Sequence, residues 1–315
     1  MLTVLPITIN KNPLPIFPGI NLSLPLLIRA LTTLMELINT ASELHQVIEE
    51  KKNAGNTVGF VPTMGALHAG HLSLLENARK ANDITVVSIF VNPTQFNDPD
   101  DLRNYPRTPE KDLTLLSGAG CDFVFMPPVE EIYPPSYQFS YTIGPLEEKM
   151  EGKFRPGHFR GVVTVVYRLF EIVTPHRAYF GEKDFQQLAI IRKMVSDLHL
   201  AVEIIPCPIV REPDGLAMSS RNLRLSPAHR QHAPLIAQTL FQAAEKGRSL
   251  SPRDLEKWVI ETINKDPYLK TEYFEIVDPD TLEQIDNWIP SKAAVGCIAV
   301  WAGEIRLIDN IRFLP

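Results

Sequence analysis

Two histidines lie three residues apart in the segment PTMGALHAGH, which runs from position 62 to 71. His68 and His71 follow a short apolar run and enter a stretch with helical spacing. A helix start offers free N–H groups and the positive end of the helix dipole, and both bind anions. Two imidazoles one turn apart add hydrogen-bond donors, and Gly70 would let a nucleotide approach the backbone. We therefore expect phosphate binding here, with a pair of buried, hydrogen-bonded histidines as the ordinary alternative.

Neutral polar side chains follow a second apolar run, in the segment FVNPTQF at 90–96. Asn92, Thr94 and Gln95 are suited to hydrogen-bond the hydroxyl or carboxylate of a small substrate. An Asn-Pro turn that only closes a strand explains this segment equally well when it is taken alone.

A lysine lies just beyond a third apolar run, in FGEKDFQQL at 180–188. Lys183 would stand where a strand gives way to a helix, so its ammonium group could meet phosphates. Asp184 could cap that helix, which is a purely structural role. Gln187 falls one helical turn after Lys183, so both side chains can face one pocket.

Two further segments combine arginine with small or polar residues. GLAMSSRN at 215–222 places two serine hydroxyls beside Arg221, which predicts a mobile loop with one fixed cation. EGKFRPGHFRGV at 151–162 gathers Arg155, His158 and Arg160 before an expected helix. Solvated surface loops are the ordinary explanation for both segments. They indicate a binding site only because the same chain also carries the two histidines.

These segments are linked by alternating strands and helices. Strands are expected at 57–61, 84–90, 122–126, 178–180 and 203–206, and helices at 42–55, 71–80, 108–118, 162–173 and 185–198. Such alternation is typical of βαβ units and of an α/β fold with a parallel, doubly wound sheet. Right-handed crossovers place the loops that follow the strands at one edge of that sheet. The loops after Val61, Phe90 and Phe180 should therefore meet there.

The pattern changes beyond Pro208. Two helices, at 227–246 and 252–264, precede extended runs at 272–277, 293–301 and 304–307, the last two of which could form an antiparallel hairpin. We expect a second, smaller α+β C-terminal domain over 210–315, after a first domain over 35–209. Residues 1–34 are interrupted by prolines and are expected to be a flexible extension, neither a signal peptide nor a membrane span.

Composition excludes some classes of protein. The 315 residues include 31 basic and 37 acidic side chains, for a net charge of -6, whereas a sequence-independent nucleic-acid binder needs a basic surface. The three cysteines, Cys121, Cys207 and Cys297, are far apart and odd in number. That spacing predicts buried, reduced thiols and neither a disulfide framework nor a structural zinc site.

Taken in order, the segments PTMGALHxGH, VNPxQF, RPGHFRGV, FGEKDxQQL and GLAMSSRN resemble the pantoate–β-alanine ligase family, the pantothenate synthetases of the HxGH nucleotidyltransferase superfamily. The match runs from about Met35 to the closing LIDN. The resemblance implies a Rossmann-like domain that binds nucleotide and pantoate, with the smaller domain as a lid. It implies an AMP-forming ligase of pantothenate biosynthesis that joins pantoate to β-alanine through a pantoyl-adenylate and releases pyrophosphate. It also implies ATP as co-substrate, Mg²⁺, a homodimer and a cytoplasmic location.

The resemblance also assigns residues to roles. It implies that His71 is catalytic, together with His68 and Lys183. It implies ATP binding by Met64, Gly65, Ala66, Leu67, His68, Ala69, Gly70, His71, Gly181, Glu182, Lys183, Asp184, Val210, Met218, Ser219, Ser220 and Arg221. Pantoate would be bound by Gln95 and Gln187, with Gln95 also near β-alanine. The metal ligands stay undefined, because Glu110-Lys111-Asp112 stands where some relatives carry neighbouring acids, which leaves Asp112 as a candidate.

Two other functions remain open at this point. Another HxGH nucleotidyltransferase would keep the nucleotide site but transfer AMP to a phosphate, for which Gln95 and Gln187 supply no cation. A non-enzymatic nucleotide-binding relative would not need His68, His71, Lys183 and Arg221 together.

Overall fold

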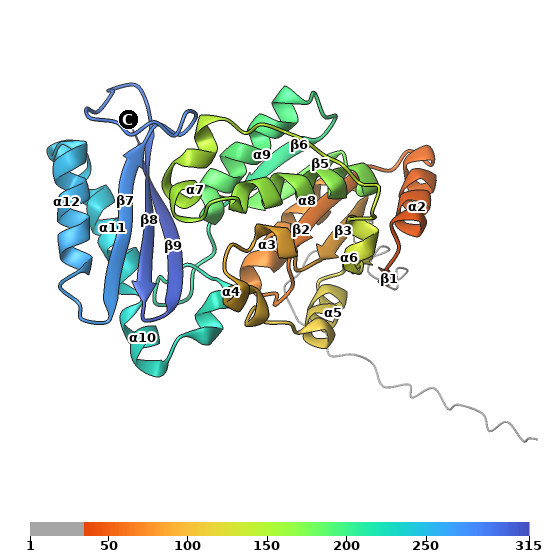
Figure 1. Ribbon diagram of the computed structural model, residues 1–315, viewed down its shortest axis with the longest axis horizontal. Coiled ribbons are helices and arrows are strands. Elements are labelled where there is room, and N and C mark those ends of the chain that lie inside the picture. The colour runs from red at the N-terminus through yellow and green to blue at the C-terminus, as the bar shows by residue number, and fades with distance from the viewer. Residues whose placement is uncertain (1–34, 315) are drawn as a thin grey trace, which may run out of the picture. The chain divides into compact units, whose positions relative to one another are not determined.

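The computed structural model describes residues 35–314, and the expectation for residues 1–34 lies outside them. Six strands in this part of the chain form one sheet in the order β1-β4-β3-β2-β5-β6, with every pairing parallel. They are β1 Glu36–Ile38, β2 Val58–Thr63, β3 Ile84–Ile89, β4 Phe123–Phe125, β5 Arg177–Gly181 and β6 Glu203–Cys207. The predicted parallel α/β fold is confirmed, and Figure 1 shows helices around this sheet.

Helices cover both faces of the sheet. The main ones are α2 Ala41–Asn53, α3 Ala69–Ala81, α5 Pro109–Gly118, α8 His158–Val173 and α9 Phe185–Asp197, and the shorter helices in this part of the chain are α4 Pro99–Arg103, α6 Val129–Ile132 and α7 Met150–Phe154. Neighbouring strand residues point to opposite faces. Phe60 and Val86 therefore pack with α2, α8 and α9, while Val61 and Val87 pack with α3 and α5. This burial on both sides explains the continuous apolar runs of the strands.

Strand β2 lies where the order of connections reverses. It pairs with β3 on one side, to which α3 leads, and with β5 on the other, which comes much later in the chain. In open α/β sheets, ligands bind beside such a point, at the carboxyl ends of the strands. The ends of β2, β3 and β5 are the three positions from which the sequence predicted converging loops.

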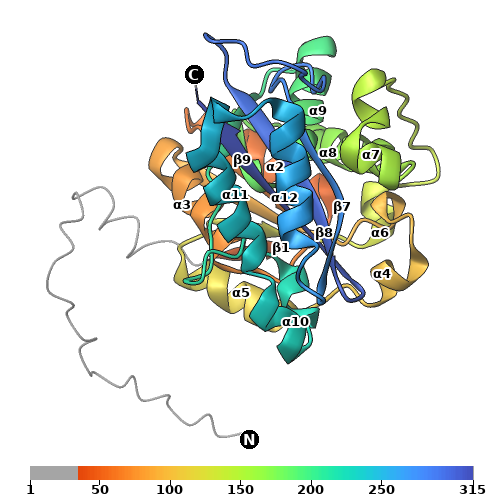
Figure 2. The same cartoon turned by 90° about the vertical axis from the view of Figure 1, so that its left-hand side faces the viewer.

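A second, antiparallel sheet consists of β7 Leu269–Val277, β8 Ala294–Ala302 and β9 Ile305–Phe313. One face packs against α11 Leu235–Lys246 and α12 Pro252–Ile263, which Figure 2 shows lying over it. The opposite face packs Tyr273, Cys297 and Ala299 against Met150 of α7 and Phe185 of α9. The smaller α+β unit predicted at the C-terminal end is therefore present, and it contacts the helices of the parallel sheet.

Some element boundaries differ from the prediction. The single helix expected over 227–246 is two helices, α10 Pro227–His232 and α11, because Pro234 has no N–H to continue the first. Helix α3 starts two residues before His71, and α8 starts four residues before Val162. Strand β1 was not expected, since three residues are too few to reveal a period.

Two expectations concern the whole described chain. All three cysteines are buried and unpaired, as their spacing predicted. Across residues 35–314, no helix combines the length and apolarity that crossing a bilayer requires.

Candidate active site

A cleft of about 220 Å³ opens at the carboxyl ends of β2, β3 and β5. It brings together most of the residues predicted from sequence: Met64, His68, Gly70, His71, Gln95, Gly181, Lys183, Asp184, Gln187, Val210, Met218, Ser219, Ser220 and Arg221. Five residues predicted to bind ATP do not line it: Gly65, Ala66, Leu67, Ala69 and Glu182. Loops far apart in sequence thus meet in one place, as the topology requires.

The two histidines form the N-terminal cap of α3. Nδ1 of His68 accepts a hydrogen bond from the Gly70 N–H at 3.1 Å, and Nδ1 of His71 accepts one from the His68 N–H at 3.4 Å. A neutral imidazole whose Nδ1 accepts carries its proton on Nε2. Each ring therefore keeps one N–H donor for a ligand in the cleft that both line.

Neither histidine is a cation at neutral pH. Burial lowers the pKa of His71 to about 3, and the nearby His68 and Lys183 lower it further. Burial and Lys183 together lower the pKa of His68 to about 4. The rings therefore offer neutral donors, while Lys183 and Arg221 supply the positive charge of the cleft.

Gly70 lines the cleft, and it also leaves space for a neighbouring side chain. A Cβ at this position would lie 2.8 Å from Cε1 of His68 and 2.9 Å from its Nδ1. The missing side chain therefore makes room for the capping imidazole of His68, and the approach of a nucleotide to this backbone stays a prediction.

Asp112 holds the loop that leads to His68 and His71. Its carboxylate accepts hydrogen bonds from the N–H groups of Ala66 at 2.9 Å and Leu67 at 2.8 Å, and from the Thr108 hydroxyl at 3.1 Å. The side chain is buried and does not line the cleft. Ala66 has a positive φ of 49°, which few non-glycine residues adopt without such support. We infer that Asp112 shapes the loop that presents His68 and His71.

Gln95 is held in a fixed orientation. Its Oε1 accepts from Nδ2 of Asn92 at 3.1 Å, and its Nε2 lies 3.0 Å from Sδ of Met64. The side-chain Oδ1 of Asn92 in turn accepts from the hydroxyl of Tyr133 at 2.8 Å. Because Oε1 and Nε2 are thereby distinguished, the amide N–H₂ group remains the donor that Gln95 can offer a ligand.

Helix α8 holds the backbone of the same turn. A Cβ on Gly161 would lie 2.4 Å from the carbonyl oxygen of Thr94, so only glycine permits this approach. Nδ1 of His158 bonds the carbonyl oxygen of Gln95 at 2.8 Å, and Nε2 of the same ring meets Nη1 of Arg155 at 3.1 Å. Arginine can only donate, so Nε2 accepts and Nδ1 carries the proton. Burial, with Arg155 adding to it, lowers the pKa of His158 to about 4.

Strand β9 fixes the other two loops of the cleft. Asn310 Nδ2 donates to the carbonyl oxygens of Glu182 at 2.8 Å and Lys183 at 3.1 Å. The neighbouring Asp309 accepts two hydrogen bonds from Arg211, at 2.6 and 3.0 Å, in the segment that leads to Met218. The lysine loop and the serine-rich loop are thus held by consecutive residues of one strand.

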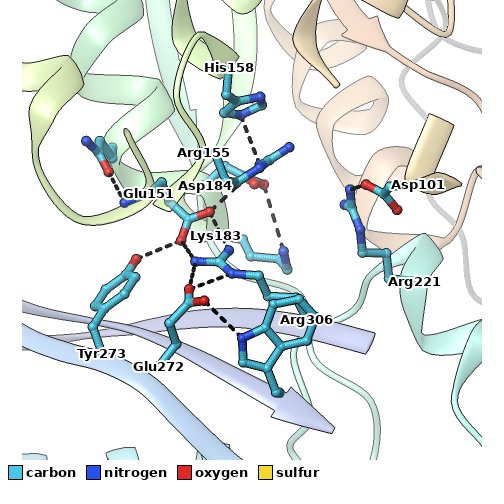
Figure 3. A network of polar contacts seen from close by, with 12 residues as sticks. Asp101, Glu151, Arg155, His158, Lys183, Asp184, Arg221, Glu272, Tyr273 and Arg306 are labelled. Carbon is cyan, nitrogen blue, oxygen red and sulfur yellow. Dashed lines mark hydrogen bonds and ion pairs between the residues drawn. The ribbon is translucent and has the colours of Figure 1, made fainter. Parts of the chain in front are cut away.

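The serine-rich loop also contacts α4. Nη2 of Arg221 lies 2.8 Å from Asp101 (Figure 3), as does Nη1 of Arg224. The hydroxyl of Tyr105 meets Oγ of Ser220 at 3.2 Å. Tyr105 lines the cleft, and no motif in the sequence pointed to it. Asp309 and Asn310 belong to the closing LIDN segment, for which the sequence predicted no role.

The described residues contain no group of three or more His, Cys, Asp or Glu side chains placed to hold a metal ion. Asp184 is the carboxylate that lines the cleft, and Nζ of Lys183 lies 4.0 Å from it.

Comparisons with known proteins agree with this arrangement. The family model described as pantoate-beta-alanine ligase matches residues 36–312. A pantothenate synthetase from Porphyromonas gingivalis strain W83 is 53% identical over 279 residues, which cover 89% of this chain and 99% of that protein. One from Phocaeicola vulgatus is 55% identical over 282 residues, again 89% and 99% of the two chains.

Solved structures give the same result. The pantothenate synthetase of Thermus thermophilus superposes with a TM-score of 0.83 at 45% identity, covering 89% of this chain and 100% of that one. The pantoate-beta-alanine ligase of Francisella tularensis, in a complex with beta-gamma ATP and beta-alanine, has a TM-score of 0.72 at 34% identity, with 88% and 97% coverage.

Proposed function

The chain belongs to the pantoate–β-alanine ligase family, and we propose that its cleft joins pantoate to β-alanine through a pantoyl-adenylate. The observation that carries this proposal is the meeting of the histidine pair, Lys183 and the serine-rich loop with Gln95 and Gln187 in one cleft. The first group suits a nucleotide, and the two glutamines suit a small hydroxylated acid.

In the first half-reaction, the pantoate carboxylate attacks the α-phosphorus of ATP. The bond to the β-phosphate breaks, pyrophosphate leaves, and a mixed anhydride with AMP remains. Negative charge grows on the phosphate oxygens during this step. We propose that the Nε2–H groups of His68 and His71 and the cations Lys183 and Arg221, which line the cleft, stabilise this charge. We propose that this electrostatic stabilisation, with no covalent enzyme intermediate, is the main contribution of the protein.

We propose that Gln95 and Gln187 hold pantoate. Gln95 is orientated by Asn92 so that its N–H₂ group donates. Gln187 lines the cleft one helical turn after Lys183. Its neighbour Gln186 points away, into hydrogen bonds with Glu151, Leu146 and Lys149. Of the two consecutive glutamines, Gln187 is therefore the one available to a substrate.

In the second half-reaction, the β-alanine amine attacks the activated carbonyl carbon. The amide bond forms, the bond to the adenylate oxygen breaks, and AMP leaves. The amine proton passes to water. The same donors that stabilised the phosphates then hold the departing AMP.

We also propose that ATP enters with Mg²⁺. That ion binds through one or two carboxylates together with substrate phosphates, so a dedicated cluster of ligands is not needed. Asp184 is the cleft carboxylate that fits this requirement, whereas the oxygens of Asp112 already accept three hydrogen bonds. When bound, Mg²⁺ would neutralise charge on the phosphates.

Product analysis tests the proposed function. With ATP, pantoate and β-alanine, the chain should form AMP, pyrophosphate and pantothenate in equal amounts, as measured by mass spectrometry. Stoichiometric ADP would exclude an acyl-adenylate. AMP transfer to a phosphate-bearing acceptor, with no use of pantoate, would favour the rival nucleotidyltransferase activity.

The division into domains, the oligomeric state and the cellular location are further proposals. We propose a division into domains at 35–209 and 210–315, the second acting as a lid, supported by the two separate sheets. We propose a homodimer, which light scattering would detect as twice the mass of one chain. We propose a cytoplasmic location, which cell fractionation would test.

A further inference from the structure

A second, smaller chamber of about 30 Å³ adjoins the cleft. It lies between α7, the start of α8 and the inner face of the antiparallel sheet, and it shares Lys183, Asp184 and Gln187 with the cleft. Its other polar walls include Glu151, Arg155 and His158. A volume of this size holds about two water-sized spheres, so it would accept a small charged group and not a whole nucleotide.

The acids of this chamber are mostly engaged. Glu151 accepts two hydrogen bonds from Arg306, at 2.6 and 2.7 Å, and one from the hydroxyl of Tyr273 at 2.8 Å (Figure 3). Asp309 is held by Arg211. Arg306 also contacts Glu272 at 2.6 Å, so its charge is balanced by two carboxylates.

Arg155 is different. Its side chain is only 19% exposed, and its ion-pair partner, the carboxylate of Glu151, is 3.8 Å away. Figure 3 shows it between that carboxylate and His158, to which it donates at 3.1 Å. Burial lowers the pKa of Arg155 to about 10, with Arg221 and Arg306 contributing and Glu151 opposing. A guanidinium group has five N–H donors, so this buried cation keeps donors and charge that these neighbours do not match.

We propose that Arg155 binds the carboxylate of the amine substrate, β-alanine, inside this chamber. The inference rests on the proposed function and adds a subsite to it. The substrate amine must face the cleft, where the activated carbonyl forms, and its carboxylate is separated from that amine by two methylene groups. The boundary that the chamber shares with the cleft allows this orientation. The planar fork of an arginine matches a carboxylate with two parallel hydrogen bonds.

The other nearby cations are less suitable. Lys183 borders both the chamber and the cleft, and Arg221 lines the cleft alone; both are already proposed to meet the phosphates. Arg306 already donates to Glu151 and Glu272. Arg155 is therefore the cation that can receive a second carboxylate without losing a close ion pair.

The test compares β-alanine with β-alaninamide, which keeps the amine and lacks the negative charge. In the wild-type chain, kcat/KM should be higher for β-alanine. In Arg155→Met, kcat/KM for β-alanine should fall roughly 10- to 150-fold, the effect of losing a hydrogen bond to a charged group. The value for β-alaninamide should change little, so the preference between the two amines should nearly vanish. Arg155→Lys should restore part of that preference, because it keeps the charge without the fork.

The first half-reaction provides the internal control. Pantoate-dependent exchange of pyrophosphate into ATP needs no amine, so Arg155→Met should retain it. Arg160→Met is the matched variant, because Arg160 belongs to the same RPGHFR segment but is 73% exposed and 3.9 Å from Glu147. It should leave the exchange and the amine preference unchanged.

Three results would overturn the proposal. One is an unchanged preference for β-alanine in Arg155→Met. Another is loss of pyrophosphate exchange in that variant with the amine preference intact, which would mean that Arg155 only positions Gln95 through His158. The third result concerns Arg155→Lys and is decisive if Arg155→Met does not fold. If Arg155→Lys keeps the full wild-type preference for β-alanine, the two parallel hydrogen bonds of an arginine are not required. Absence of exchange in the wild-type chain would instead contradict the proposed function.

Discussion

Helices α3 and α8 both carry histidine at their N-terminal ends, yet they use it in opposite ways. At α3, the imidazoles of His68 and His71 accept hydrogen bonds from the backbone of their own helix and keep Nε2–H for the cleft. At α8, His158 donates Nδ1–H to the carbonyl oxygen of Gln95 and accepts from Arg155. The first pair keeps its donors for the cleft, and the second ring presents a donor to another protein segment.

The difference shows that the hydrogen-bond partner of Nδ1 decides the role of each ring. All three histidines have lowered pKa values, caused first by burial. A lowered pKa therefore does not separate a ligand-binding histidine from a positioning one. The tautomer does, because it determines which nitrogen carries the proton and where that proton points.

The largest effect is expected at the ligand-facing ring. His71→Asn should lower turnover by about 10²–10³, the usual cost of a lost donor to charge that develops in the transition state. Asparagine keeps an oxygen near the position of Nδ1 and can still cap α3, so thermal stability should stay near that of the wild type. Lys183→Ala should lower turnover to a similar degree. AMP release and thermal unfolding, measured on the same samples, check both.

His71→Ala removes the cap as well as the donor, and it should cost an additional ~1 kcal/mol of stability. If His71→Asn loses as much stability as His71→Ala, the ring is needed for packing and the proposed contact with phosphate loses its support.

A smaller effect is expected at the glutamines. Gln95→Ala or Gln187→Ala should reduce pantoate kcat/KM by roughly 10- to 150-fold, the equivalent of about 1.5–3 kcal/mol for a hydrogen bond to a charged group. ATP affinity, measured by calorimetric titration, should be unchanged. Gln186→Ala is the matched neighbour, and it should mainly lower stability because that side chain is buried in backbone contacts. Equal loss of ATP affinity in Gln95→Ala would place that glutamine in the nucleotide site.

The positioning ring should give a weaker effect still. His158→Leu removes the donor to the Gln95 carbonyl, for which a neutral hydrogen bond of about 0.5–1.5 kcal/mol predicts roughly a 2- to 12-fold fall in pantoate kcat/KM. His158→Asn places an amide N–H₂ near Nδ1 and should recover most of that loss. An equal fall in both variants would mean that the ring acts by packing and not through this hydrogen bond.

A last prediction concerns pH and stability. Folded pKa values of about 4 for His68, 3 for His71 and 4 for His158 lie below the ~6.5 of an unfolded histidine. The unfolded chain therefore binds more protons between these values, so the free energy of unfolding should rise with pH up to about 6.5 and then level off. Urea unfolding between pH 5 and 7.5 measures this slope. Each of His71→Asn and His158→Asn should reduce it, and a variant with the wild-type slope would show that its histidine titrates normally when folded.

Much of the site followed from the sequence because its motifs lie at the ends of strands. The apolar runs that became β2, β3 and β5 located three loops, and parallel topology required them to meet. What the sequence did not reveal are contacts between segments far apart along the chain. Asp112 is separated from Ala66 by 46 residues, and no local pattern links a carboxylate to a loop at that distance.

The start of α8 was misplaced for a local reason. Gly157 has a φ of 82° and precedes the first helical residue, so the helix includes His158, Phe159 and Arg160, which look like the end of a charged loop. The burial of Arg155 was missed for a different reason. Its charge resembled that of a solvated surface, whereas the folded chain places it between Glu151 and His158 with 19% of its side chain exposed.

Strand β9 affects which amino-acid substitutions this enzyme can tolerate. Asp309 and Asn310 are adjacent on a rigid strand, and each restrains a different loop of the cleft. The two loops therefore share one reference point, and a shift of the strand would displace both in the same direction and preserve their separation. In a saturation mutagenesis survey, substitutions at positions 309 and 310 should lower activity about as often as substitutions at the positions proposed to face the ligands. This is expected although the side chains of Asp309 and Asn310 bond to loops of the protein and not to a ligand. Directed evolution toward bulkier amines should then find more accessible solutions around the chamber than along this strand.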